Sequence, residues 1–167
     1  DYVNSGRTSI AVTNFDREMI GLYHPKVAGG YEDVALRAGV GDASRNRLGF
    51  GCVFADLDLD GQLDHVVATG HLDEPVRSLR SGVGQAFPPL LFLNSGNGRV
   101  RDVAAHAGAD FARPRVGRGL ACGDFDRDGD LDVLMTTNGG PAVLFRNDQT
   151  AGNRSIRRSE AQPSELQ

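Results

Sequence analysis

The sequence predicts an all-β fold, a partial β-propeller built from about three four-stranded antiparallel blades. Three observations predict it: a repeated unit, short apolar runs separated by turns, and an excess of glycine and aspartate. Glycine makes up 22 of the 167 residues, and 17 of the 22 acidic residues are aspartate. Aspartate favours turns and metal loops whereas glutamate favours helices, so this composition argues against a helical bundle.

Most of the aspartates belong to a repeat. Residues 48–64 align with residues 116–132 at an offset of 68, and both stretches hold an apolar run followed by alternating aspartates. A second apolar run follows in each copy and ends in asparagine, at Asn94 and at Asn147. Repeated units of this length stack on their neighbours and bury a continuous core between them. The repeat therefore predicts a slice of a larger assembly of similar units.

A third element places a further unit before these two. Residues 31–40 match residues 100–109 at an offset of 69, and the first nine residues keep one aspartate and the glycine of the acidic run. We use the positions of the acidic runs to divide the chain into repeat units. The predicted units cover residues 1–55, 56–115 and 116–157, and we expect residues 158–167 to be a non-native or disordered tail.

Within each unit, short apolar runs indicate antiparallel strands. They are four to eight residues long, rich in Val, Leu, Phe and Thr, and separated by turns such as the Asn-Ser-Gly-Asn-Gly of residues 94–98. Such runs are typical of strands and hairpins. The stretches 33–38 and 102–107 favour helices of only one or two turns. Antiparallel blades repeated every 55 to 68 residues favour a β-propeller with insertions.

Two acidic loops carry the chemistry of this sequence. Each has the pattern D-x-D-x-D-G-x-x-D, and together they hold nine of the 17 aspartates. Glycine at the sixth position permits the positive φ that a tight turn needs. Side-chain oxygens at positions 1, 3, 5 and 9, with a backbone carbonyl at position 7, suit Ca²⁺. The predicted ligands are Asp56, Asp58, Asp60, Gln62 and Asp64 in the second loop (residues 56–64), and Asp124, Asp126, Asp128, Asp130 and Asp132 in the third loop (residues 124–132).

Two other interpretations of these loops compete with calcium between strands. An EF-hand needs a bidentate glutamate at its twelfth position, where this sequence has Val67 and Met135. Turn aspartates without a metal would repel one another, because two carboxylates about 4–5 Å apart cost roughly 3–4 kcal/mol at an effective dielectric near 20. Calcium sites between strands are therefore the favoured interpretation.

The first loop (residues 1–9) is a doubtful third calcium site. It begins with Asp1 and keeps a glycine at its sixth position. Val3, Ser5 and Ser9 stand at three of the positions where the other loops have aspartate. Most of the charge that attracts a divalent cation is therefore missing.

The motifs resemble a known family. Residues 123–134 followed by residues 143–147 resemble the FG-GAP/VCBS repeat of integrin-α-like β-propellers. More narrowly, residues 69–72, a polar insertion and residues 88–94 are similar to the ASPIC/UnbV group, the bacterial relatives of cartilage acidic protein. In that group the last blade leads into a C-terminal domain, and the stretch from Asn147 to Arg154 is similar to its beginning.

This resemblance implies a seven-bladed, calcium-binding propeller that is exported and serves adhesion or ligand binding. About three units cannot close a ring that needs at least four blades. The sequence therefore predicts a fragment of such a propeller. Its implied partner is an extracellular protein or glycan, and its implied location is extracellular, periplasmic or at the cell surface.

The sequence carries little evidence for catalysis. It has no G-x-S-x-G, metalloprotease or phosphate-loop motif. His65 stands where the sister repeat has Val133, so we expect a strand residue that is partly buried, and we expect His106 to be solvated. One polar group remains as a candidate ligand-binding site, because long loops on rigid scaffolds often bind ligands. It consists of His71, Asp73 and Glu74 at the start of the insertion 70–89.

Composition and charge exclude several partners and leave one alternative function. The net charge of −4 gives no signal for nucleic acid, and no run of 18 apolar residues predicts membrane insertion. Nothing in the sequence indicates a homo-oligomer, and Cys52 and Cys122 are expected to be small core residues. The leading hypothesis is a non-catalytic calcium-binding interaction module. The alternative is an accessory propeller of a secreted polysaccharide-active enzyme.

Overall fold

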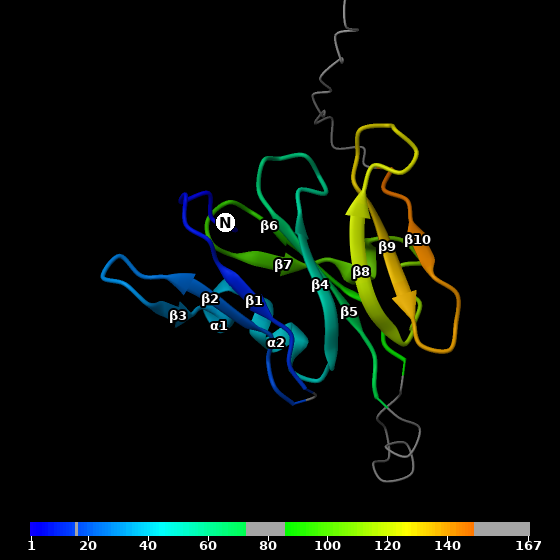
Figure 1. Cartoon of the computed structure of the whole chain (residues 1–167), viewed down its shortest axis with the longest axis horizontal. Coiled ribbons are helices and arrows are strands. Elements are labelled where there is room, and N and C mark those ends of the chain that lie inside the picture. The colour runs from blue at the N-terminus through cyan, green and yellow to red at the C-terminus, as the bar shows by residue number, and fades with distance from the viewer. Residues whose placement is uncertain (16, 73–85, 149–167) are drawn as a thin grey trace, which may run out of the picture.

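Three antiparallel β-sheets lie side by side in the computed structural model, which describes residues 1–15, 17–72 and 86–148 (Figure 1). The first sheet has the order β1–β2–β3, the second β4–β5–β6–β7 and the third β8–β9–β10. Their bounds are β1 Ile10–Val12, β2 Gly21–Pro25, β3 Tyr31–Asp33, β4 Gly49–Ala55, β5 Asp64–Thr69, β6 Leu90–Asn94, β7 Val100–Asp102, β8 Gly117–Gly123, β9 Asp132–Thr137 and β10 Val143–Phe145. The predicted all-β fold of about three blades is confirmed.

The number of strands per blade differs from the prediction. Among the described residues only the second sheet has four strands, and the outer two have three each. In the first sheet, β1 follows its loop as β5 and β9 follow theirs, so that sheet holds counterparts of the second to fourth strands. The third sheet holds counterparts of the first three. The seven-bladed ring stays a prediction.

The sheet boundaries and the repeat boundaries do not coincide. β4 pairs with β5 through Ala55 and Asp64, so the second sheet begins at Gly49 and not at residue 56. The acidic loop is therefore a hairpin within one sheet and does not join two sheets. The third sheet begins at Gly117.

The predicted short helices are present. α1 (Ala35–Ala38) and α2 (Val40–Ser44) follow β3, and a 3₁₀ turn at Ala104–His106 follows β7. A carboxylate precedes α1 and the 3₁₀ turn in the same way, because Asp33 accepts the Ala35 N–H at 2.9 Å and Asp102 accepts the Ala104 N–H at 3.0 Å. α2 begins after Gly39, without such a side chain. No helix among the described residues is long and apolar enough to cross a membrane.

Two apolar cores join the sheets. Ile20, Leu22 and Phe92 belong to the core between the first and second sheets, and Val66 and Phe111 belong to the core between the second and third. Cys52 packs against the first core and Cys122 against the second, and both are free thiols, as expected for small core residues. Each core lies between two units, so neither unit buries its apolar face alone.

Some predictions concern residues outside the described part. Asp73 and Glu74 lie in the stretch 73–85, which is not described. The predicted beginning of a C-terminal domain and the tail at 158–167 lie within residues 149–167, which are also outside it, apart from Asn147 and Asp148. The structure does not test these predictions.

The close approach of two strands explains why residue 51 is glycine. A Cβ on Gly51 of β4 would lie 2.8 Å from the Arg118 carbonyl oxygen and 2.8 Å from the Leu120 nitrogen of β8. Both of these atoms are backbone, so they cannot turn aside as the end of a flexible side chain can. Glycine is required here because the first strands of two neighbouring sheets pass this close to each other.

Replacing Gly51 by alanine should therefore push β4 and β8 apart. We expect Gly51→Ala to lower the free energy of unfolding by about 1–3 kcal/mol, the usual cost of overpacking. Gly123→Ala is the matched control, because no atom lies within 4 Å of the Cβ it would add. Urea denaturation measures both variants, and equal effects of the two substitutions would contradict this account of the interface.

His65 is a strand residue, as its place in the repeat predicts, but it is fully buried and not partly buried. The side chain is 1% exposed in β5, and its ring stacks on Phe54 with ring centroids 4.5 Å apart. Neither ring nitrogen has a hydrogen-bond partner, although both are buried. Burial disfavours the charged imidazolium and lowers the pKa of His65 to about 4.

This buried histidine should make stability depend on pH. The unfolded chain takes up a proton near the ordinary pKa of 6.5 and the folded chain only near pH 4, so its contribution is complete above pH 6.5 and is lost as the pH falls. His65→Val copies the sister repeat. Between pH 7 and pH 4.5 we expect the wild-type chain to lose up to about 3 kcal/mol more unfolding free energy than this variant. Parallel pH profiles in denaturant titrations would contradict the prediction.

Candidate metal centres

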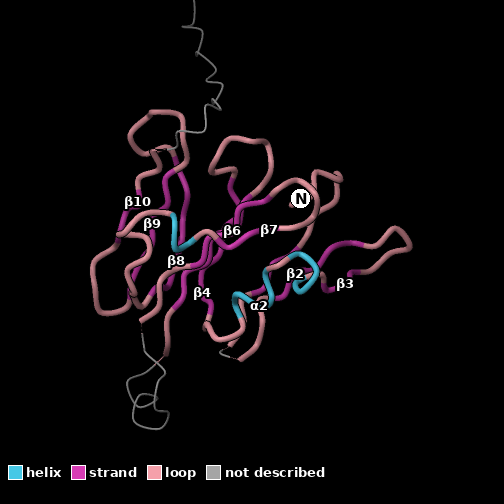
Figure 2. Tube along the Cα trace, turned by 180° about the vertical axis from the view of Figure 1, so that it is seen from behind, coloured by secondary structure: helices cyan, strands magenta, loops and turns pink. Residues whose placement is uncertain are grey.

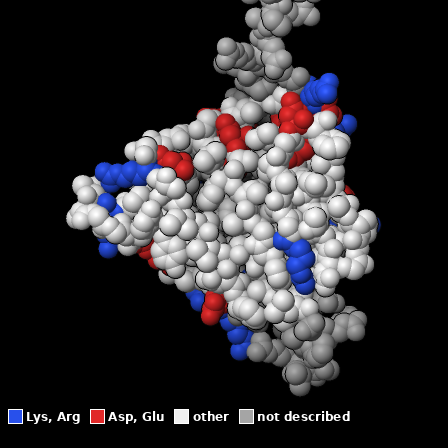
Figure 3. Space-filling model, viewed as in Figure 1, with Lys and Arg blue, Asp and Glu red and all other residues white. Residues whose placement is uncertain are grey.

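All three loops lie along one edge of the molecule. The first loop precedes β1, the second connects β4 to β5 and the third connects β8 to β9, and both views place them on the same side (Figures 1 and 2). Figure 3 shows acidic side chains gathered along this edge. The predicted metal ligands therefore line up from sheet to sheet.

The three loops share one backbone conformation. The sixth residue of each is a glycine with positive φ, as the sequence predicts: +76° at Gly6, +85° at Gly61 and +106° at Gly129. The fourth residue also has positive φ although it is not glycine, at Asn4, Leu59 and Arg127. Sequence reasoning missed this feature, because leucine and arginine give no signal for a left-handed conformation.

Hydrogen bonds from the loop backbone orient the aspartates. In the second loop the Asp60 N–H donates to Asp58 Oδ1 at 3.3 Å and the Gln62 N–H donates to Asp60 Oδ1 at 2.7 Å. The third loop repeats both bonds: the Asp128 N–H donates to Asp126 Oδ1 at 3.2 Å and the Asp130 N–H donates to Asp128 Oδ1 at 2.9 Å. A carboxylate offers about four lone-pair positions, so N–H groups and a cation can share one carboxylate.

Three carboxylates converge in each of these two loops. In each group, one oxygen atom of every member lies within 4.8 Å of the others; the groups are Asp56, Asp58 and Asp64 in the second loop and Asp124, Asp126 and Asp128 in the third. The other predicted ligands, Asp60, Gln62, Asp130 and Asp132, lie in the same loops but outside these two groups. A hard divalent cation suits such oxygen donors.

Burial and mutual repulsion disfavour the charged form of a carboxylate in the second loop. Burial raises the pKa of Asp58, and the neighbouring Asp60 and Asp56 carboxylates raise it further, against backbone hydrogen bonds that lower it. The side-chain oxygen of Gln62 is buried without a hydrogen-bond partner. A bound cation would offset this repulsion, so the residues present fit a calcium ion.

The ninth residue of each acidic loop is a buried aspartate that binds two backbone N–H groups. Asp64 is 0% exposed and accepts from Leu57 and Asn94, both at 2.9 Å. Asp132 accepts from Phe125 and Asn147, both at 2.8 Å. Burial raises the pKa of Asp64 to about 6, and the two N–H groups oppose that rise. These aspartates therefore join the start of their loop to the end of the third strand.

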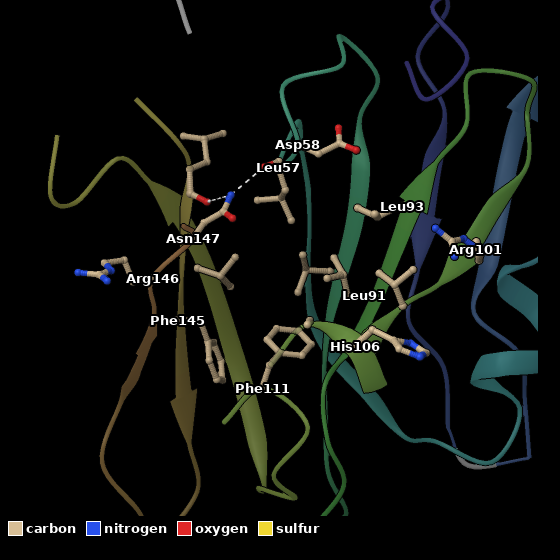
Figure 4. Close-up of a pocket in the computed structure, with 15 residues that line it drawn as sticks. Leu57, Asp58, Leu91, Leu93, Arg101, His106, Phe111, Phe145, Arg146 and Asn147 are labelled. Atoms are coloured by element: carbon tan, nitrogen blue, oxygen red, sulfur yellow. Dashed lines mark hydrogen bonds between the residues drawn. The ribbon is translucent and has the colours of Figure 1, made fainter. Parts of the chain in front are cut away.

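Sequence reasoning missed the contacts of two asparagines, Asn94 at the end of β6 and Asn147 two residues after β10. Asn94 and Asn147 marked the repeat only as strand ends, yet the Asn147 side chain points to the loop of the preceding unit and donates to the Leu57 carbonyl at 2.7 Å (Figure 4). Asn94 donates in the same way to the Tyr2 carbonyl at 2.5 Å. The only sign of these contacts in the sequence was that an asparagine follows the second apolar run in both repeats.

The first loop keeps the turn with a single acid. The Asp1 carboxylate accepts the N–H groups of Val3, Gly6 and Arg7 and the Ser5 hydroxyl. Ser9 Oγ is hydrogen-bonded to His24 Nδ1 at 3.0 Å, where the other loops have their buried aspartate. This loop therefore closes on itself, in line with the doubt about a third calcium site.

The polar group predicted at the insertion is only partly described. His71 is 5% exposed, its Nδ1 accepts the Leu72 N–H at 2.9 Å, and its carbonyl oxygen accepts from Arg118 at 2.9 Å. The ring is buried and its Nε2 has no hydrogen-bond partner among the described residues, and a ligand-binding role for His71 stays a prediction. His106 is exposed, as predicted.

A cleft that the sequence did not predict lies between the second and third sheets. It has a volume of about 440 Å³, and apolar side chains such as Leu91, Phe111 and Phe145 line it (Figure 4). Asp58 of the second loop also lines it. Its walls come from residues far apart in the chain, so no local pattern could have announced it.

Comparisons with known proteins agree with the repeat. Residues 86–135 match the FG-GAP-like repeat family. The chain is 45% identical over 58 residues to cartilage acidic protein 1 of Mus musculus, covering 35% of this chain and 9% of that protein. It is 40% identical over 70 residues to the Homo sapiens protein, covering 42% of this chain and 10% of that protein. The predicted resemblance to FG-GAP repeats and to cartilage acidic protein is confirmed, over about a tenth of the relatives' length.

The buried aspartate should matter even without metal. Asp64→Ala leaves the Leu57 and Asn94 N–H groups without their acceptor, so we expect the free energy of unfolding in EDTA to fall by about 2–4 kcal/mol. Asp60→Ala is the matched control, because Asp60 is exposed and removing it lessens repulsion. Its effect in EDTA should stay below about 1 kcal/mol. Equal losses in urea denaturation would mean that Asp64 acts no differently from the other loop acids.

Proposed function

We propose that this FG-GAP-repeat segment is a calcium-stabilised part of an exported β-propeller, and that it serves as a non-catalytic module that binds a protein or glycan partner. One observation carries the calcium assignment: the same turn recurs in two loops and brings three carboxylates of each within 4.8 Å. The match to FG-GAP repeats supports the propeller.

Calcium in this proposal stabilises the fold and takes no part in a reaction. Asp56, Asp58 and Asp64 would hold one ion, and Asp124, Asp126 and Asp128 the other. Each ion would neutralise carboxylates that otherwise repel one another at the edge where neighbouring sheets meet. Calcium sites of extracellular modules are weak, with Kd values on the order of 10⁻⁴–10⁻³ M. Sites of this affinity would fill in a calcium-rich compartment, as the proposed export requires.

The proposed partner surface rests on the arrangement of loops around rigid sheets. Long loops on such scaffolds are common binding elements. The insertion 70–89 is the longest connection between two strands of the second sheet, and its residues 73–85 lie outside the described part. It stays the candidate for partner contact on the strength of the sequence.

Thermal unfolding with and without calcium tests the calcium assignment. At ten times Kd each site contributes about 1.4 kcal/mol, so two sites should raise Tm by roughly 5–10 °C. The double variant Asp58→Asn, Asp126→Asn should lose this rise. In EDTA it should melt at the wild-type temperature or above it, because asparagine keeps the turn hydrogen bond and removes a charge. An unchanged wild-type Tm in calcium would contradict the proposal.

Two controls complete the experiment. Asp42→Asn makes the same substitution at an exposed helical position, where Asp42 pairs with Arg45 at 3.5 Å, and should keep the full calcium response. Binding of the chain to a glycan array or to immobilised matrix proteins tests the interaction role. We expect binding that EDTA weakens, and the absence of binding to both would contradict that role.

A further inference from the structure

The two asparagines repeat one set of hydrogen bonds at corresponding places. Asn94 donates from its side-chain amide to the Tyr2 carbonyl and, at 3.1 Å, to the Leu63 carbonyl. Asn147 donates to the Leu57 carbonyl and, at 3.3 Å, to the Leu131 carbonyl. An asparagine amide has two N–H donors, and both are used each time. One bond reaches the asparagine's own acidic loop and the other reaches the loop of the preceding unit.

Each asparagine is also fixed at its backbone. Its N–H donates to the buried ninth aspartate of its own loop, Asp64 for Asn94 and Asp132 for Asn147. Three hydrogen bonds therefore hold each residue where two units meet. This arrangement differs from apolar packing between sheets, because it fixes the position of particular loop atoms.

Asn147 touches both candidate calcium loops. Leu57, its acceptor in the second loop, lies between Asp56 and Asp58, two members of the converging group. Leu131, its acceptor in the third loop, directly precedes the buried Asp132. The amide thus links the backbone beside one carboxylate group to the backbone of the other loop, and Figure 4 shows the Asn147 side chain directed toward Leu57.

Among the described residues, asparagine side chains bind the second loop at three points and the third loop at one. At the first of the three points, Asn4 donates to the Gly61 carbonyl at 2.9 Å. Asn94 binds the second loop at Leu63 and Asn147 binds it at Leu57. In the third loop the residue that corresponds to Leu57 is Phe125, which is 74% exposed, against 8% for Leu57. Among the described residues no asparagine side chain donates to the Phe125 carbonyl. The second loop is therefore the more preorganised of the two.

We propose that Asn147 is a positioning residue that couples the two calcium loops, so that the second loop owes part of its calcium affinity to a residue of the next unit. This inference rests on the proposed calcium binding. Asn147 does not belong to either carboxylate group; it acts by fixing the Leu57 backbone between two ligands. Without this bond the second loop must be ordered when calcium binds, and ordering a backbone costs affinity.

Calcium titration of one isolated site tests the proposal. Asp126→Asn weakens the third loop, so the heat of calcium binding to this background reports the second loop alone. Adding Asn147→Leu should raise the Kd of that site roughly three- to tenfold, the size expected for one lost hydrogen bond. Asn138→Leu is the matched control: it makes the same substitution at an exposed position after β9 and should leave the Kd unchanged.

The outcomes separate this inference from the proposed function. Absence of calcium binding to the wild-type chain overturns both. Calcium binding with an equal Kd in the Asn147→Leu and background chains overturns only the coupling. Should Asn147→Leu fail to fold in EDTA, Asn147→Ser replaces it, because serine keeps a polar group that is too short to reach both carbonyls. A raised Kd in Asn147→Ser supports the coupling, and an unchanged one overturns it.

Discussion

The structure depends on a buried aspartate that accepts two backbone N–H groups. Asp64 and Asp132 each join the start of an acidic loop to the asparagine that follows the third strand. Asn94 lies 30 residues after Asp64, and Asn147 lies 15 residues after Asp132. The loop acquires its shape from this bond, and the strand-end asparagine is thereby placed to reach the preceding unit. In the second unit, the converging carboxylate group, the hairpin and the contact between units thus share the Asp64 side chain.

The first unit shows what happens when this interaction is absent. Ser9 stands at the place of the buried aspartate, and Pro25 stands at the place of the asparagine, since Tyr23 pairs with Ile10 as Phe92 pairs with His65. Proline has no N–H to donate to such a carboxylate. The first unit therefore lacks the loop aspartates other than Asp1, the buried acceptor and the asparagine donor, all together. The turn itself persists, with positive φ at Asn4 and Gly6.

Local pattern was enough to predict the turns, the strands and the acidic loops. The positive φ of Gly61 and Gly129 and the strand position of His65 follow from spacing and from comparison of the two repeats. The two asparagine bonds between units could not be predicted, because each joins residues about 90 positions apart and depends on how two sheets stack. The start of the second sheet at Gly49 was missed for a similar reason: strand pairing, and not repeat phase, decides it.

Counting bound calcium tests the central claim most directly. Equilibrium dialysis against millimolar calcium should give two ions per chain, one for each group of converging carboxylates, and one ion per chain for Asp126→Asn. Zero ions bound to the wild-type chain, or the same number bound to the variant, would contradict the assignment of these loops as calcium sites.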